Sequence, residues 1–158
     1  MIANRRLVTN HRSGFTLVEI LIVVVIMAVL AATIIPQFSS SATDAKNSSL
    51  AFNLHTLRSQ IELYKLHHNG AVPAITSGAL PQLTLYTDVA GATSTTPDST
   101  HLFGPYVQSK LPNNPLNTSN VVIATSAFPP TAATTDGGWL YYEATGQLAP
   151  NDAAHLTD

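Results

Sequence analysis

One carboxylate stands inside the most apolar stretch of the chain. Residues 11–20 read HRSGFTLVEI, so a short basic leader stops at Gly14 and an apolar run containing Glu19 begins at Phe15. An unpaired ionised side chain deep in a membrane costs about 2.5–3.5 kcal/mol on insertion scales. Such an acid implies a partner, and we interpret Glu19 as an assembly residue. The alternative is an incidental glutamate that snorkels to the membrane surface.

Other residues that could catalyse a reaction or bind a metal ion are scattered. The six histidines form no HExxH pattern, and His67–His68 is more typical of a helix end than of a metal site. No GxSxG, GxxxxGK or GxGxxG pattern follows a predicted strand. The chain has no cysteine, which removes disulfides and thiolate chemistry. The sequence therefore predicts neither an enzyme nor a cofactor.

The net charge of -2 hides an asymmetry along the chain. Arg5, Arg6 and Arg12 all precede Phe15, which leaves four basic and nine acidic residues from there onward, a net charge of -5. A body of that charge offers no basic surface for phosphates. We therefore expect no nucleic-acid partner.

The element that positions Glu19 is a predicted membrane helix. Residues 15–35 carry one charge, and a helix of that length spans roughly 30 Å, the thickness of the bilayer interior. The arginines lie on its N-terminal flank, so the positive-inside rule keeps the leader in the cytoplasm and sends the rest outward. A secretory signal with small residues Ala28, Ala31 and Ala32 is the alternative, but its apolar core is usually about 7–15 residues long.

Residues 14–38, GFTLVEILIVVVIMAVLAATIIPQF, resemble the N-terminal signature of type IV pilins and type II secretion pseudopilins. The resemblance implies that prepilin peptidase removes residues 1–14 by cutting after Gly14 and then methylates the new amino terminus at Phe15. It also implies that Glu19 pairs with the terminal amine of a neighbouring subunit. Physical chemistry agrees, because two buried charges of opposite sign compensate each other only in the assembled state.

After the membrane helix of residues 15–36, the sequence predicts an amphipathic helix over residues 37–70. Pro36 has no amide hydrogen and is expected to break or kink the helix; the resemblance implies local flexibility of the spine there, and a helix-exit proline is the alternative. Asn69 and Gly70 supply a C-terminal cap, and Pro73 prevents continuation. An apolar stripe with 4-3-4-3 spacing is expected to pack on a small domain; it consists of Leu50, Leu54, Leu57, Ile61 and Tyr64.

Residues 71–158 predict that small domain. We expect a short helix or turn in residues 78–88, a polar loop at 90–101, and a hairpin of 139–143 and 147–149. A strand at 120–125 is implied by the resemblance of residues 103–125 to major pseudopilins that is described below. Trp139, Tyr141 and Tyr142 are interpreted as core residues rather than a ligand platform. The predicted fold class is α+β and pilin-like, with a long N-terminal helical spine packed on a small C-terminal antiparallel sheet.

A second, looser resemblance covers FGPYVQSKLPNNPLNTSNVVIAT, residues 103–125, which is similar to a segment of major pseudopilins. Major pseudopilins bind calcium in a C-terminal loop, and the oxygen-rich residues Asp136, Asn151 and Asp152 flank the predicted hairpin. These three residues are calcium candidates only, because the ligand pattern of the family is not clearly reproduced.

The function expected from these observations is a structural subunit of a type II secretion pseudopilus. It would be anchored once in the inner membrane with its C-terminus in the periplasm, and would then enter a periplasmic filament. The expected partners are prepilin peptidase, other pseudopilins, copies of itself, an inner-membrane assembly platform and, before assembly, membrane lipid. The alternatives are a type IV pilin for adhesion, motility or DNA uptake, and a membrane-anchored periplasmic binding module.

Overall fold

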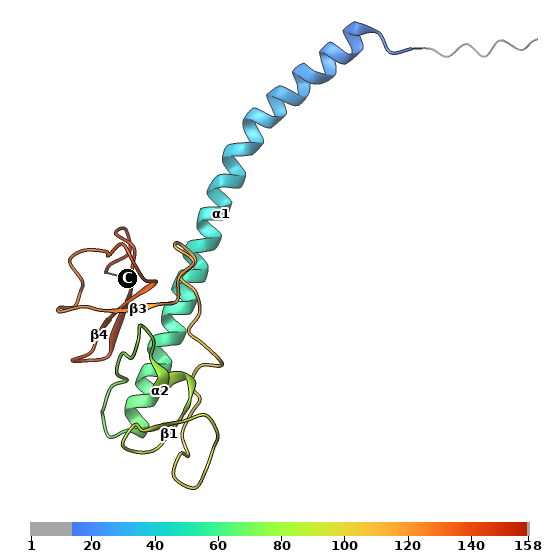
Figure 1. Cartoon of the computed structure of the whole chain (residues 1–158). Helices are drawn as coiled ribbons and strands as arrows, with labels where there is room; N and C mark the ends of the chain where they lie inside the picture. Colours follow the sequence, from blue (N-terminus) through green and yellow to red (C-terminus); the bar gives the residue numbers. More distant parts are fainter. Residues whose placement is uncertain (1–13, 158) are drawn as a thin grey trace, which may run out of the picture. The chain divides into compact units, whose positions relative to one another are not determined.

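The structure is a computed structural model that describes residues 14–157. One long helix, α1 (Leu17–His67), leads into a short helix, α2 (Pro81–Thr84), and five short strands (Figure 1). The chain forms two compact units, Met1–Ala42 and Thr43–Asp158, which we call the N-terminal unit and the globular unit. The predicted leader, with Arg5, Arg6 and Arg12, lies outside the described residues except for Gly14.

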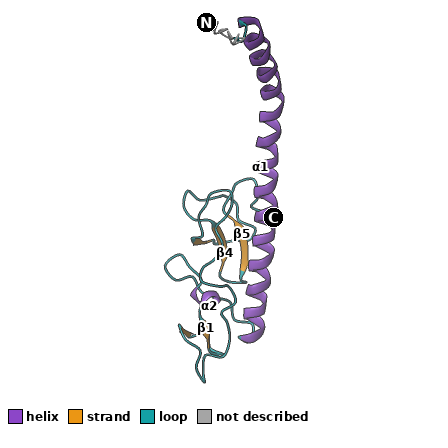
Figure 2. Cartoon of the chain, turned by 90° about the vertical axis from the view of Figure 1, so that its right-hand side faces the viewer, coloured by secondary structure: helices purple, strands orange, loops and turns teal. Residues whose placement is uncertain are grey.

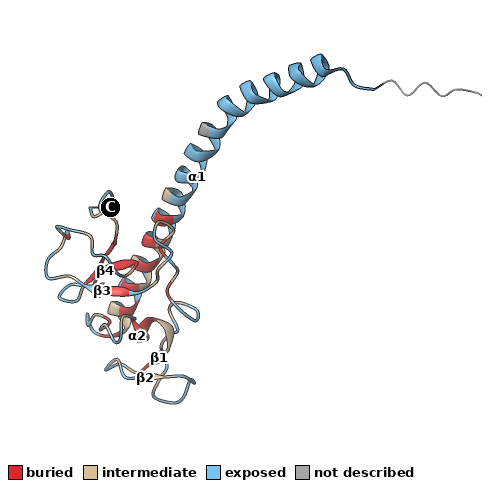
Figure 3. Cartoon of the chain, turned by 45° about the horizontal axis from the view of Figure 1, so that its top comes forward, coloured by how far each residue is buried: buried red, intermediate tan, exposed pale blue. Residues whose placement is uncertain are grey.

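The N-terminal unit is a single stretch of α1 with apolar side chains all around it. Its large apolar residues from Phe15 to Phe38 are exposed, as the blue colour of this stretch shows in Figure 3. The run IVVV is helical although β-branched residues are weak helix formers in water. Position 36 lies inside α1, so the helix is not broken or ended at Pro36, whereas a kink or local flexibility there stays a prediction. A proline removes one amide donor, and the hydrogen bonds on both sides keep the helix continuous.

The second half of α1 supplies one wall of the core in the globular unit. All five residues of the predicted apolar stripe are buried, with exposed fractions from 1% at Leu57 and Ile61 to 4% at Leu54. They pack with side chains from α2, the loops and the sheet, namely Leu80, Leu83, Leu111, Val122, Trp139, Tyr141 and Leu148. Burying side chains of this size supplies the main driving force for the fold, at about 1.5–3 kcal/mol each.

The predicted cap ends α1 as expected. Asn69 and Gly70 have positive φ angles of 53° and 84°, and the Gly70 amide donates to the carbonyl oxygen of Lys65 at 2.8 Å. This bond spans five residues and satisfies a carbonyl that the ending helix leaves unpaired, as in a Schellman motif.

The main sheet has three strands, β3 (Val122–Ala124), β4 (Trp139–Tyr142) and β5 (Gln147–Pro150), in the order β3-β4-β5. The predicted hairpin is confirmed, with β4 and β5 antiparallel and Leu140 opposite Ala149. β3 and β4 run parallel, however, so the sheet is mixed rather than antiparallel throughout. The connection of residues 125–138 is long enough for the crossover that parallel strands need. Figure 2 shows β5 beside α1 within the globular unit.

The rest of the globular unit is mostly loop. The short helix expected in residues 78–88 is confirmed as α2. β1 (Tyr86–Thr87) pairs antiparallel with β2 (Thr93–Ser94), so the stretch 90–101, predicted as a loop, contains a short strand. Trp139 and Tyr141 are buried as predicted, whereas Tyr142 is only half-buried. β4 therefore contributes fewer aromatic rings to the core than the sequence predicted.

Candidate functional site at the start of α1

The first turn of α1 is closed by a reciprocal pair, Thr16 and Glu19. The Thr16 amide and hydroxyl both donate to Oε2 of Glu19 at 2.9 Å, and the Glu19 amide donates to the Thr16 hydroxyl at 3.2 Å. This is a capping box, in which two side chains satisfy amide donors that the helix start leaves unpaired. Glu19 thus orders its own helix as well as carrying the charge that the sequence singled out.

The sequence contains the signal for this cap. A threonine followed three residues later by a glutamate, just before an apolar run, is the usual pattern of a capping box. The interpretation of Glu19 as an intermolecular group passed over its local partner, Thr16. Both roles are compatible in geometry, because the described bonds to the carboxylate all use Oε2.

Gly14 and Phe15 lie at an open position before the helix. A Cβ atom added to Gly14 would meet no atom within 4 Å, and the Phe15 side chain is 84% exposed. Glycine at position 14 is therefore not needed for packing within the described chain.

The apolar side chains beyond this turn are not covered by any other part of the chain that the structure describes. α1 contains an 18-residue window with a mean hydropathy of 3.0, none of it buried. By length and composition alone, this helix could cross a membrane; a signal sequence near an N-terminus would pass the same test. An apolar surface of this extent is expected to contact lipid or other apolar helices.

Comparison with known families bears directly on this segment. Residues 9–35 match the model of the prokaryotic N-terminal methylation motif. This motif includes the open Gly14–Phe15 bond and the capping box, and its residues 9–13 lie outside the described part of the chain.

Several curated proteins named type II secretion system core protein G are similar to this chain. The protein of Pseudomonas aeruginosa is 39% identical over 69 residues, 44% of this chain and 48% of that protein. The protein of Dickeya chrysanthemi is 35% identical over 60 residues, 38% and 39% of the two chains. That of Escherichia coli K12 is 34% identical over 62 residues, 38% and 43%. The matches thus span less than half of each relative. No solved structure matches the chain significantly.

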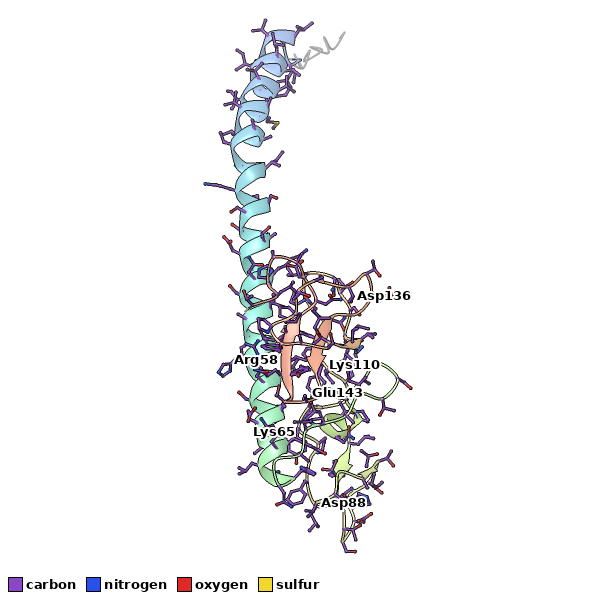
Figure 4. The ribbon with its side chains drawn as sticks, turned by 90° about the vertical axis from the view of Figure 1, so that its left-hand side faces the viewer. Arg58, Lys65, Asp88, Lys110, Asp136 and Glu143 are labelled. Atoms are coloured by element: carbon purple, nitrogen blue, oxygen red, sulfur yellow. The ribbon has the colours of Figure 1, made fainter. Side chains whose placement is uncertain are left out.

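The globular unit brings two of the three calcium candidates, Asp136 and Asn151, into contact, whereas the side chain of Asp152 contacts other residues. Asn151 is buried, and its side-chain nitrogen donates to the backbone oxygen of Asp136 at 2.6 Å. The Asp136 residue itself is exposed, at the outer end of the loop in Figure 4. The carboxylate of Asp152 turns to its own neighbours, accepting from the Ala154 amide at 3.1 Å and contacting Nδ1 of His155 at 2.6 Å. Asn151 and the backbone of Asp136 are therefore brought together, while the Asp152 carboxylate is engaged elsewhere.

The donor set of this loop does not fit calcium. Calcium takes six to eight oxygen ligands, usually with several carboxylates. Here an amide nitrogen, a hydrogen-bond donor, faces the backbone oxygens of the loop. Within residues 14–157, no group of three or more His, Cys, Asp or Glu side chains could hold a metal ion.

The histidines at the end of α1 belong to an aromatic cluster that the sequence did not reveal. The His68 ring stacks on Tyr64 with centroids 3.8 Å apart, and its Nε2 lies 3.0 Å from the hydroxyl of Thr87. The His67 ring stacks on Phe103 and contacts the Tyr106 hydroxyl at 3.0 Å. Burial raises the pKa values of the Tyr64 and Tyr106 phenols, because a phenolate loses its hydration there. These rings act as packing groups that fix the end of the helix against β1.

Proposed function

We propose that this chain is a structural subunit of a type II secretion pseudopilus. The observation that carries the proposal is the combination at the start of α1. A Gly–Phe bond in open space, an acid on the first turn and an uncovered apolar helix follow one another within the matched methylation motif. The names of the similar proteins favour type II secretion over a surface type IV pilus.

In this proposal, the leader stays in the cytoplasm and the globular unit lies in the periplasm. Prepilin peptidase cuts after Gly14 and methylates Phe15, and the subunit waits in the inner membrane with its apolar helix in lipid. The assembly platform then transfers it into a filament of copies and related pseudopilins. The role is structural: apolar helix surface exchanges lipid contacts for contacts with neighbouring helices, and the acid of each subunit meets the amine of the next.

The decisive test is the identity of the mature N-terminus. The membrane-extracted protein is expected to begin at N-methylated Phe15 in mass spectrometry when prepilin peptidase is co-expressed, and at Met1 when it is not. A chain that begins near Ala32 in both strains would indicate an ordinary signal peptidase and a periplasmic binding module instead.

A substitution at the cleavage site sharpens this test. Gly14→Leu is expected to leave full-length precursor, because the peptidase needs an unhindered backbone at the cut. Among the described residues no atom lies within 4 Å of a side chain begun at position 14, so this variant disturbs no packing contact there. Ser13→Ala, one residue away, is the matched control and is expected to be processed. Normal processing of Gly14→Leu would contradict the proposed enzyme.

A further inference from the structure

The side-chain amide of Asn151 lies at the centre of a cluster of oxygen atoms. Its nitrogen is 2.6 Å from the Asp136 carbonyl oxygen, 2.9 Å from that of Gly137 and 3.2 Å from that of Thr134. The Thr134 hydroxyl adds a fourth oxygen at 2.9 Å. One NH2 group has two hydrogens, so four oxygens share them. Several backbone oxygens converging on one point is an arrangement in which proteins often place a cation.

The orientation of this amide is fixed by its other end. Oδ1 of Asn151 accepts from the Thr134 backbone amide at 2.7 Å, which only an oxygen can do. A flipped side chain would set its nitrogen against that donor and its oxygen against the four oxygens. The nitrogen therefore faces the oxygen cluster.

Two more asparagines hold the same loop. Asn117 donates to the carbonyl oxygens of Gly137 and Asn151 at 3.0 and 3.2 Å, and the buried Asn114 donates to that of Gly138 at 2.8 Å. We call Asn114, Asn117 and Asn151 the asparagine clamp. Its amides are neutral donors, so it satisfies loop carbonyls without bringing a net charge into the globular unit.

The loop fits this clamp closely. A Cβ atom at Gly138 would overlap the backbone oxygen of Ser119, so the two backbone segments touch directly. The backbone N–H of Asn151 also donates to the Gly138 carbonyl oxygen at 3.0 Å, which ties the end of β5 to the start of β4. The position is thus closed on several sides by direct protein contacts.

We propose that the side-chain amide of Asn151 replaces a bound cation in this loop by donating hydrogen bonds to the converging oxygens. The globular unit is therefore stable without calcium. The amide gathers the carbonyl oxygens of residues 134, 136 and 137, as a divalent ion would, and it stays attached to the chain at any calcium concentration. The inference concerns the globular unit alone and does not rest on the proposed function.

The first experiment compares the melting temperature of the purified full chain in detergent with EDTA and with millimolar CaCl2, followed by near-UV circular dichroism. The two melting temperatures are expected to agree. A cation present at a hundred times its dissociation constant would raise the melting temperature of a domain of this size by roughly 10 °C. A rise of that size on adding calcium to the natural sequence would overturn the proposal.

The second experiment changes the amide to a carboxylate. Asn151→Asp places a charged oxygen among the carbonyl oxygens, so the variant is expected to melt roughly 5–10 °C lower in EDTA and to recover in CaCl2. Asn53→Asp is the matched control: its amide makes one long bond of 3.4 Å to the Asn113 carbonyl oxygen, and neither effect is expected. An Asn151→Asp chain that melts like the natural one in EDTA would also overturn the proposal.

A third measurement remains decisive if Asn151→Asp does not fold. In the natural chain in EDTA, the side-chain NH2 protons of Asn151 are expected to exchange with solvent much more slowly than those of Asn53, as measured by NMR on a 15N-labelled sample. Equal exchange rates for the two residues would show that the amide is not held by the oxygen cluster.

Discussion

At the scale of single residues, Tyr141 combines full burial with one specific hydrogen bond. Its ring belongs to the core cluster, and its hydroxyl donates to the carbonyl oxygen of Pro73 at 2.8 Å. Burial is the main reason that the pKa of this phenol lies above its ordinary value of 10.0, and the negative charge of Glu143 adds to the shift. The neutral phenol therefore stabilises the fold, and the phenolate opposes it.

This leads to a prediction about alkaline pH. A folded-state pKa above the unfolded value means that the stabilisation is complete below about pH 10 and is lost as the pH rises further, because the unfolded chain then releases the proton more readily. Tyr141→Phe is expected to lower the free energy of unfolding by about 1–3 kcal/mol at neutral pH, since the Pro73 carbonyl loses its donor. It should also lose stability less steeply above pH 10.

Denaturant unfolding at a series of pH values from about 7 to 11 measures both effects. Tyr142→Phe, half-buried on the same strand, is the matched control and is expected to change stability less. A Tyr141→Phe variant with the natural free energy of unfolding would contradict the role of this bond.

Some contacts of single residues could be predicted from the sequence and others could not. The sequence singled out Glu19, and its partner Thr16 was readable from the capping-box spacing. The contact of His68 with Thr87 could not be predicted from the sequence, because Thr87 reaches the end of the helix only through tertiary packing, whereas Tyr64 is four residues away on the same helix. The asparagine clamp was hidden for the same reason: its members are separated by up to 37 positions in the chain and meet through loop geometry.

At the scale of elements, the buried stripe of α1 decides whether the globular unit forms. Arg58, on the same helix, donates to the carbonyl oxygen of Leu148 in β5 through Nε at 3.0 Å and Nη2 at 2.8 Å. Apolar burial on one face and this bidentate contact together attach the sheet to the helix. Figure 4 shows Arg58 on α1 next to the strands of the globular unit.

The stripe makes a prediction about core packing. Leu57 is 1% exposed, and Leu57→Ala is expected to lower the free energy of unfolding by about 2–5 kcal/mol. The substitution loses apolar contact and leaves a cavity. Leu66, 77% exposed on the same helix, is the matched control, and Leu66→Ala is expected to stay within about 0.5 kcal/mol of the natural chain. Equal losses in urea unfolding would contradict the assignment of the core face.

Helix periodicity predicted this stripe because a 3.6-residue repeat is a local property. The hairpin was predictable for a similar reason, since β4, β5 and the turn at Gly146 are adjacent in sequence. The parallel pairing of β3 with β4 was not predictable, because it depends on the path of residues 125–138 and on the clamp that closes it. Of the two outcomes expected at Pro36, the break does not occur, because one missing amide donor does not interrupt a long helix, and the kink stays a prediction.

At the scale of the whole molecule, helix periodicity and the hairpin pattern, together with the family resemblance, predicted the α+β architecture. The proposed function depends on how subunits meet. The capping box gives Glu19 a local role that needs a hydrogen-bond acceptor, whereas pairing with a neighbour's amine needs a negative charge. Two substitutions at one position separate these roles.

Glu19→Gln keeps an oxygen for the capping box and removes the charge, and Glu19→Leu removes both. Both variants are expected to insert into the membrane, because each removes the cost of an unpaired acid, and both are expected to lose most filament incorporation. Cross-linking and shearing of filaments from cells that supply the other subunits measures incorporation. A Glu19→Gln variant that assembles like the natural protein would show that capping, rather than charge pairing, is the requirement.

The link between Arg58 and Leu148 joins residues 90 positions apart, and this separation sets an order of events in time. α1 is built from local contacts and can form early, whereas the sheet that covers its stripe needs long-range closure and forms later. During synthesis, the leucines of the stripe are therefore uncovered while the first half of the helix already carries its own apolar surface. A newly made chain is therefore expected to be prone to aggregation until the sheet covers the stripe.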